Sequence, residues 1–360
     1  MSSSLQRENE LHANNDADTA LGLIPDLNNV TPVTVPLILR VSRTAYEYLK
    51  RLNAIERFRS EFFVDYGIHL PDMHLTVGEA IEDNKVVMLI NEIRADEYTL
   101  FFDKVAIING NEEIEQLGID CINHNNVLWT DSSNRKTLRE LGFFTRTPVD
   151  ELYYCIAPTL VRNVNEYFGI QETKSHLDKL EKDYPDLIKE VTRNITVQRV
   201  AEIFQRLLSE RISVRNARLI AESIAHWSPR EKDVITLVEH VRGTLSRYIT
   251  HKFASGNTVR VVLLSSGIEE IFRKATRNTS GGAFLNLEPD EAERLMDCFE
   301  VSTSKIYMSQ KDYVVLTSID VRRFVKRFLG DKFRNLEVLS FGEITDSVDV
   351  EVITTINMEG

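Results

Sequence analysis

The chain has 360 residues, of which 42% are hydrophobic and 27% charged, and its formal net charge is −12. This length and composition predict two to four compact units with real hydrophobic cores. The acidic balance disfavours nucleic acid as the main partner, because the phosphate backbone is also negative. The three cysteines (Cys121, Cys155 and Cys298) lie far apart, so we expect reduced thiols rather than a disulfide framework.

The N-terminal segment, residues 1–32, is polar and nearly free of aromatic residues. Such a composition cannot bury enough apolar surface to offset the entropy lost on ordering, so we expect a flexible linker. The apolar runs of the chain are strand-sized, well below the roughly 20 residues that cross a bilayer. The N-terminus also lacks a signal-peptide pattern. We therefore expect a soluble chain.

The next part of the chain predicts a strand at Val33 to Val41, then a helix from Ser42 or Arg43 to Gly67. Further strands are predicted at Met73 to Val77, Lys85 to Arg94 and Tyr98 to Ile108. This β-α-β-β order is typical of a ferredoxin-like unit that still lacks its last helix. A helix predicted from Pro158 to Phe168 would supply it.

Most of the remaining chain is predicted to be helical up to about residue 254, and then to alternate between strands and helices. Within the helical part, Ser228-Pro229-Arg230-Glu231 has the pattern of a capping box and predicts a helix start. The overall fold class is α+β, and we expect four compact subdomains. Their predicted boundaries are 33–109 plus 158–172 (ferredoxin-like), 110–157 (a small insert), 173–256 (all-helical) and 257–360 (α/β).

Motifs that carry catalysis or cofactors are missing from the sequence. It has no Walker or Gly-x-Gly-x-x-Gly pattern, no zinc-ligand spacing and no Gly-x-Ser-x-Gly pattern. The segment Ser265-Ser266-Gly267 superficially resembles a nucleophile elbow, but a strand end followed by a helix N-cap is the favoured interpretation. We expect no catalytic, cofactor or metal site, and therefore not an enzyme.

Two groups of charged residues are candidates for binding other macromolecules. The predicted helix 319–334 carries Arg322, Arg323, Lys326 and Arg327. A solvated basic side is favoured there over a nucleic-acid surface, and an acidic protein partner is the functional alternative. Arg215, Arg218 and Glu222 are spaced for one helical face, where they form either a solvated stripe or a polar subunit interface.

Three long segments carry a resemblance to a known family. They are Asp150 to Lys174 (DELYYCIAPTLVRNVNEYFGIQETK), Thr196 to Ile249 (with LLSERISVRNARLIAESIAHWSPREKDVITLVEHVRG) and Val314 to Ile344 (with TSIDVRRFVKRF). These blocks resemble the export-gate proteins of bacterial type III secretion, and most of all the invasion-type virulence members. Flagellar members usually have an Arg-Asp-Asn segment where this chain has His74-Leu75-Thr76-Val77.

The resemblance implies a platform for protein export. Members have a membrane-spanning N-terminal half, which this sequence does not contain, and a four-subdomain half at the cytoplasmic face of the bacterial inner membrane. That half builds a ring, nonameric in the family, which binds export chaperone–substrate complexes and a gatekeeper protein. A separate ATPase helps delivery, so the family itself needs no catalytic site. The alternative function is a monomeric regulatory or nucleic-acid-binding adaptor that uses helix 319–334.

The resemblance also implies roles for individual residues. Arg215, Arg218 and Glu222 match an Arg-x-x-Arg-x-x-x-Glu stretch in the third subdomain, where ring contacts concentrate. The basic helix lies in the fourth subdomain, which helps to bind substrates and the ATPase stalk protein. The chaperone pocket of flagellar members lies between the first two subdomains. There Trp129, Phe143 and Phe144 are candidates for apolar contacts, although for each of them a role in the core is the favoured interpretation.

Overall fold

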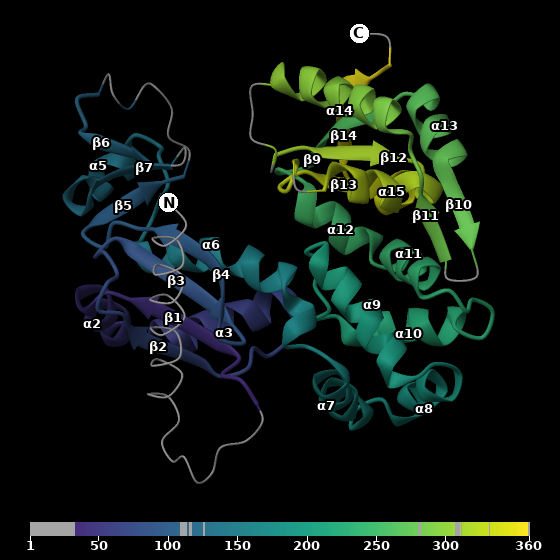
Figure 1. Cartoon of the computed structure of the whole chain (residues 1–360), viewed down its shortest axis with the longest axis horizontal. Coiled ribbons are helices and arrows are strands. Elements are labelled where there is room, and N and C mark those ends of the chain that lie inside the picture. Colours follow the sequence, from purple (N-terminus) through teal and green to yellow (C-terminus); the bar gives the residue numbers. More distant parts are fainter. Residues whose placement is uncertain are drawn as a thin grey trace, which may run out of the picture. The chain divides into compact units, whose positions relative to one another are not determined.

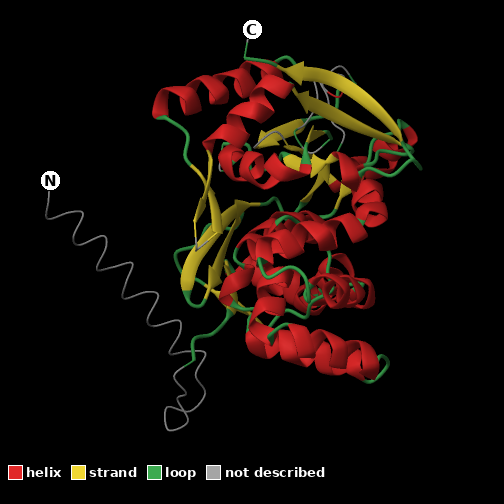
Figure 2. Ribbon diagram, turned by 90° about the vertical axis from the view of Figure 1, so that its right-hand side faces the viewer, coloured by secondary structure: helices red, strands yellow, loops and turns green. Residues whose placement is uncertain are grey.

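The computed structural model describes residues 33–108, 114, 117–124, 127–279, 282–306, 310, 312–330 and 332–358, so the predicted linker 1–32 lies outside the described residues. The chain divides into two compact units, residues 1–169 and residues 170–360 (Figure 1). Helices are combined with several small separate sheets (Figure 2), which confirms the predicted α+β class. Over the described ranges, no helix has both the length and the apolarity that a membrane crossing requires.

The first sheet of unit 1 has the strand order β2-β1-β3-β4. Its strands are β1 (Leu37–Val41), β2 (Met73–Val77), β3 (Lys85–Ile90) and β4 (Ile93–Thr99). β1 is parallel to β2 and antiparallel to β3, and β3 is antiparallel to β4. In a split βαβ unit an antiparallel strand would separate β1 from β2, whereas here they are direct neighbours. This sheet therefore differs from the ferredoxin-like order in the placement of β3.

Two helices, α2 (Arg43–Arg51) and α3 (Ala54–Tyr66), connect β1 to β2, where the sequence predicts one continuous helix. The chain breaks at Asn53, which has the left-handed φ of 48° that asparagine tolerates better than most residues. Gly67, with a φ of 82°, ends α3 as predicted. Phe58 and Phe62 on α3 are fully buried, so this helix supplies much of the core beside the sheet.

The second sheet of unit 1 has the order β6-β7-β5-β8. Its strands are β5 (Lys104–Ile107), β6 (Cys121–His124), β7 (Val127–Asp131) and β8 (Thr145–Arg146). The short helices η2 (Ser132–Asn134) and α5 (Arg135–Glu140) follow β7. The predicted strand Tyr98 to Ile108 is therefore wrong, because this range contains the end of β4 and all of β5, which belong to different sheets.

Helix α6 (Pro148–Arg162) follows the second sheet, and a short turn η3 (Val164–Glu166) follows α6. The predicted start at Pro158 is wrong by ten residues. The helix begins after Thr147, whose hydroxyl and the carboxylate of Asp150 form a capping box, while Pro158 lies inside the helix. Proline is common in the first helical turn, and Pro148 rather than Pro158 occupies that position.

The N-terminal part of unit 2 is helical, as predicted. Its helices are α7 (Ile170–Glu181), α8 (Pro185–Asn194), α9 (Val197–Ser209), α10 (Ala217–Trp227), α11 (Val234–Thr244) and α12 (Ser246–Phe253). The capping box predicted at Ser228 to Glu231 is wrong. Ser228 is the C-cap of α10, and α11 begins after Asp233, whose carboxylate accepts a hydrogen bond from the backbone N–H of Thr236.

The C-terminal part of unit 2 is built on a parallel sheet with the order β13-β12-β9-β14. Its strands are β9 (Thr258–Leu264), β12 (Val314–Thr317), β13 (Glu337–Ser340) and β14 (Asp349–Ile356). The associated helices are α13 (Ser266–Ala275), α14 (Pro289–Ser304), α15 (Ile319–Leu329) and η4 (Phe341–Glu343), and β10 (Thr276–Thr279) pairs with β11 (Gly282–Leu285) in a hairpin.

Two predictions for this part have clear outcomes. Ser265 is the N-cap of α13 and its hydroxyl accepts a hydrogen bond from the N–H of Ile268, as the strand-end interpretation predicts. The predicted helix 319–334 is too long, because α15 ends at Leu329 and Gly330 follows with a φ of 43°. The finer boundaries of the four subdomains stay a prediction.

Candidate interaction surfaces and a buried ion network

Helix α10 presents a charged face to solvent. Arg218 and Glu222 lie one turn apart on it, with 3.8 Å between Nε and Oε1, and their side chains are 59% and 52% exposed. The guanidinium of Arg218 also lies 4.9 Å from the ring centre of Tyr184 on the segment before α8. An exposed pair of this kind adds little to stability, which leaves both charges available for another surface.

Arg215 does not share that helical face. It lies before the N-cap of α10, Asn216, whose side chain accepts a hydrogen bond from the N–H of Leu219. The buried side chains of Ile212 and Val214 fix this segment against the core in a non-helical conformation. The prediction that Arg215, Arg218 and Glu222 occupy one helical face is therefore wrong for Arg215, which is exposed beside the helix start.

The three aromatic candidates of unit 1 lie in different environments. Trp129 on β7 is 2% exposed and meets the ring of Phe101 edge to face, with 5.4 Å between ring centres. Phe143 is half-buried and packs against the small core formed by Ile107, Ile114 and Leu138. Phe144 is 69% exposed. Of the three, Phe144 has its ring at the surface of the unit, whereas Trp129 has the position of a core residue.

The basic helix α15 is not uniformly solvated. Arg322 is 1% exposed, so its placement on a solvated basic face is wrong. Lys326 donates hydrogen bonds to the carbonyl of Leu336 and to Glu337, and Arg323 lies 3.8 Å from Asp233. Arg327 is exposed. Arg322 is buried because the helical period places it on the apolar face of α15, beside the buried Val325 and Leu329.

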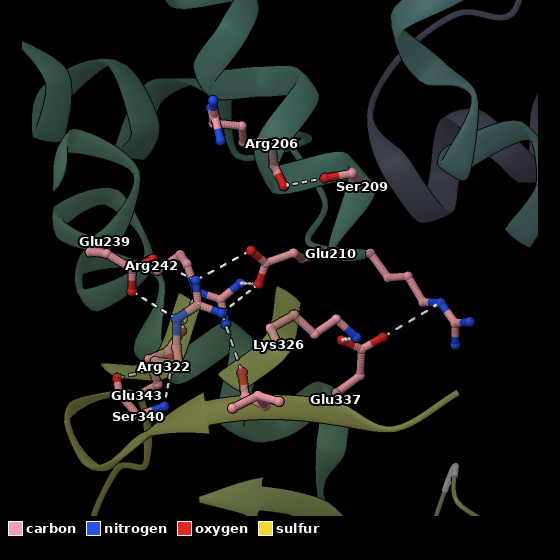
Figure 3. Close-up of polar contacts among 12 residues, drawn as sticks. Arg206, Ser209, Glu210, Glu239, Arg242, Arg322, Lys326, Glu337, Ser340 and Glu343 are labelled. Carbon is pink, nitrogen blue, oxygen red and sulfur yellow. Dashed lines mark hydrogen bonds and ion pairs between the residues drawn. The ribbon is translucent and has the colours of Figure 1, made fainter. Parts of the chain in front are cut away.

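Arg322 lies between two carboxylates that come from the helical part of unit 2 (Figure 3). Its Nε and Nη2 donate to the two carboxylate oxygens of Glu239 on α11, at 2.8 and 2.5 Å. Its Nη1 and Nη2 donate to Glu210, the C-cap of α9, at 2.5 and 3.2 Å. The planar guanidinium is suited to such paired contacts, and they leave no charge of this arginine uncompensated.

A second buried arginine extends the cluster. Nη1 of Arg242 on α11 donates to Oε2 of Glu210 at 2.7 Å, and its Nε lies 2.6 Å from Oε1 of Glu343 in η4. The other oxygen of Glu343 accepts hydrogen bonds from the N–H and hydroxyl of Ser340. We call Glu210, Glu239, Arg242, Arg322 and Glu343 the ion network. It ties α9 and α11 to α15 and η4, and so joins the helical and α/β parts of unit 2.

Electrostatics within the ion network favour the charged forms of Glu210 and Arg322. Burial opposes ionisation of Glu210, but the positive charges of Arg322 and Arg242 outweigh that penalty and lower its pKa to about 2. Burial likewise opposes the charge on Arg322, yet Glu210 and Glu239 raise its pKa well above the ordinary value. Glu210 and Arg322 therefore hold each other ionised.

Sequence reasoning did not find the carboxylate partners of Arg322. A signal for them is present, because Glu239 directly follows Val238 and Arg242 directly follows Val241, on the buried side of α11. Charged residues at core positions of two helices indicate a buried pair, since an isolated buried charge is too costly to persist. Spacing alone does not show which carboxylate meets which arginine.

The described residues contain no group of three or more His, Cys, Asp or Glu side chains arranged to hold a metal ion. The other features of note are exposed surface residues and the ion network inside unit 2. Two surfaces come from the predicted residues: the exposed face of α10 with Arg218 and Glu222, and Phe144 at the edge of the second sheet.

Comparison with known proteins shows extensive similarity. The model of the FHIPEP family matches residues 2–349. The chain is 51% identical over 342 residues to the invasion protein InvA of Salmonella typhimurium and 43% identical over 346 residues to the protein MxiA of Shigella flexneri. These alignments cover 94% and 95% of this chain and 50% of each relative, so the chain spans about half the length of the curated relatives it matches.

Solved structures agree with this fold. The C-terminal domain of InvA matches with a TM-score of 0.80 and 51% identity, covering 90% of this chain and all of that domain. The nonameric EscV cytosolic domain from the type III secretion system matches with a TM-score of 0.73 and 30% identity, over 91% and 98% of the two chains. A Chlamydia pneumoniae complex of CdsV and CdsO matches with a TM-score of 0.83 and 28% identity, over 92% and 100%.

Proposed function

Because this chain belongs to the FHIPEP family, we propose that it is the ring-forming docking platform of a type III secretion export gate. The observation that carries the proposal is the combination of an exposed charged face on α10 with similarity to a nonameric cytosolic domain. A closed ring needs a heterologous interface, in which one patch of each subunit meets a different patch of the next. Exposed charges of both signs can set the register of such an interface.

In the ring, Arg218 and Glu222 contact charges on the adjacent subunit, and Arg215 lies at the edge of the same contact. The platform binds export chaperone–substrate complexes, a gatekeeper protein and the stalk protein of the ATPase, at the cytoplasmic face of the bacterial inner membrane. The solved complex of CdsV with CdsO supports a protein partner of this kind. Phe144 is an apolar contact for these partners, because exposed aromatic side chains are frequent interface anchors.

In this proposal the protein has no catalytic role, and energy for export is supplied elsewhere. The rival function, a nucleic-acid-binding adaptor, is weakened by the burial of Arg322 and by the contact of Lys326 with Glu337. These contacts occupy two of the six basic side chains in residues 319–334, on which the rival depends.

The ring is tested by sedimentation velocity over a wide concentration range, with negative-stain imaging of the largest species. We expect closed uniform particles for the parent chain and a shift toward monomer for Arg218→Glu. We also expect the double reversal Arg218→Glu with Glu222→Arg to remain monomeric. It restores the pair within α10 but presents reversed charges to the adjacent subunit.

The control is Lys174→Glu on α7. Lys174 and Asp178 form another exposed pair one helical turn apart, 2.6 Å between Nζ and Oδ1, so the reversal changes net charge equally. We expect this variant to assemble like the parent chain. If both reversals weaken assembly equally, general charge repulsion explains the result and the α10 interface is wrong. If neither weakens it, the ring contacts lie elsewhere.

A further inference from the structure

Strand β14 is the edge strand of the C-terminal sheet, and α14 lies beside it. Between them is a groove of about 660 Å³. The helix contributes one face, formed by Arg294, Asp297, Cys298, Val301, Ser302 and Lys305. The strand contributes residues from Ile353 to Thr355, and Asn357 and Met358 continue the wall beyond its end. The opposite face of α14, with Leu295 and Phe299, is buried in the core, so the helix is held in place while its outer face lines the groove.

The backbone of β14 points hydrogen-bonding groups into this groove. In a parallel ladder, residues that bond to the neighbouring strand alternate with residues whose N–H and C=O point away from it. The carbonyl of Ile356 accepts a hydrogen bond from the N–H of Ser265, which directly follows β9. The backbone N–H and C=O of Ile356 therefore point toward β9. The backbone N–H and C=O of Thr355, one residue earlier, therefore point away from β9, on the side of the groove that Thr355 lines. The carbonyl of Thr355 accepts a hydrogen bond from the side chain of Asn357. Among the described strands, β9 is the only one paired with β14.

We propose that the groove between β14 and α14 is a docking site for an extended peptide segment of another protein, which adds to β14 as a strand. An edge strand beside a helix recognises such a segment in two ways. The backbone of the strand bonds to the backbone of the peptide, and the helix forms a wall for alternate side chains. The free edge requires an occupant with an extended backbone, because a helical segment has no unpaired backbone groups to offer along its length.

The side chains of the groove define the chemistry of the occupant further. Val301 is 52% exposed and Cys298, Ile306 and Ile353 are half-buried, so the wall offers apolar contacts at alternate peptide positions. Arg294 and Lys305 are two cations on the exposed rim, against the single carboxylate of Asp297. This locally positive rim on an acidic chain favours a peptide with acidic residues flanking its apolar core.

The proposal is tested with random linear peptides displayed on phage and selected against the full chain. Affinities of the enriched peptides are then measured by fluorescence anisotropy for the parent and for three variants. Thr355→Pro removes the outward N–H without touching the ladder to β9, and Thr355→Val keeps that N–H as the matched control. Ser302→Trp fills the groove from the helix side, so the test does not depend on one variant folding.

We expect enriched peptides with alternating apolar residues. They should bind about tenfold more weakly to Thr355→Pro and Ser302→Trp, and unchanged to Thr355→Val. Hydrogen exchange should slow in residues 349–356 when a peptide is bound. The proposal is overturned if no peptide is enriched, or if the enriched peptides bind the proline and tryptophan variants as tightly as the parent. Assembly of the chain into a ring is not part of this readout, so the outcome is independent of the proposed function.

Discussion

At the scale of single residues, Glu210 shows how the interior of unit 2 depends on ionisation. Its carboxylate accepts hydrogen bonds from both buried arginines, Arg322 and Arg242. The pKa of Glu210 is lowered to about 2, whereas an unfolded chain would leave it near the ordinary value of 4.5. Because the folded pKa is lower, the unfolded state binds a proton more readily as the pH falls.

Glu210 should therefore contribute stability that is complete above about pH 5 and is lost between about pH 5 and pH 2. The pKa difference corresponds to about 3 kcal/mol. We expect Glu210→Gln to show a smaller fall in the free energy of unfolding than the parent chain on going from pH 6 to pH 3. Urea denaturation at a series of pH values measures the free energy of unfolding of both proteins. Parallel pH profiles for the two proteins would show that Glu210 is not responsible.

Single residues also show what residue type cannot decide. Trp129 and Arg322 are both candidates for partner binding and both are buried, which for Trp129 agrees with the favoured interpretation as a core residue. Aromatic and arginine side chains are enriched both in interfaces and in well-packed interiors, so residue type does not separate the two roles. The period of α15 already placed Arg322 on the apolar face, and that observation was the better guide.

At the scale of elements, the N-terminal part of α15 is held by charges from other helices. Before its first turn, the carboxylate of Glu269 on α13 accepts hydrogen bonds from the N–H and hydroxyl of Ser318 and from the hydroxyl of Thr317. Burial works against the charge of Glu269, but these hydrogen bonds lower its pKa overall. A carboxylate at a helix N-terminus is also favoured by the helix dipole. In the next turn, Arg322 donates hydrogen bonds to Glu210 at the end of α9 and to Glu239 on α11.

Removing Arg322 should weaken this attachment strongly. Arg322→Ala leaves the buried Glu239 and the half-buried Glu210 with one cation fewer, and we expect a loss of about 3–5 kcal/mol in the free energy of unfolding. Arg327→Ala is the control, because Arg327 is exposed on the same helix and its loss should change stability by less than about 0.5 kcal/mol. Urea denaturation of both variants at neutral pH makes the comparison. Equal stability of the two variants would mean that the ion network does not hold α15.

Element type was more predictable than element boundaries. The helical stretch of unit 2 and the strand Met73–Val77 follow from periodicity, because packing on one face repeats along the chain. The starts of α6 and α11 did not follow, since several serine, threonine, aspartate and proline residues near each start competed for the cap. Tertiary contacts select one of them, and in both helices the side-chain oxygen of the capping residue accepts a hydrogen bond from a backbone N–H of the first turn.

At the scale of the whole molecule, the chain combines two compact units whose internal contacts are separate. Each member of the ion network lies in unit 2, and so do Arg218 and Glu222 on α10. The pairing of sheets within each unit could not be derived from the sequence, because it depends on contacts between residues far apart in the chain. For example, β14 pairs with β9, about 90 residues earlier, which no local pattern predicts.

Unit 2 should therefore fold and keep its ion network without unit 1. We expect the polypeptide 170–360 to unfold cooperatively, because the core shared by its parallel sheet with α13, α14 and α15 lies within this range, as does the ion network that ties α9 and α11 to α15. Arg322→Ala should destabilise it by the same amount as it destabilises the full chain, to within about 0.5 kcal/mol, since none of the partners of Arg322 is removed. Circular dichroism during thermal and urea denaturation measures both quantities. A polypeptide without a cooperative transition, or one that Arg322→Ala leaves unchanged, would show that the stability of unit 2 depends on residues before Ile170.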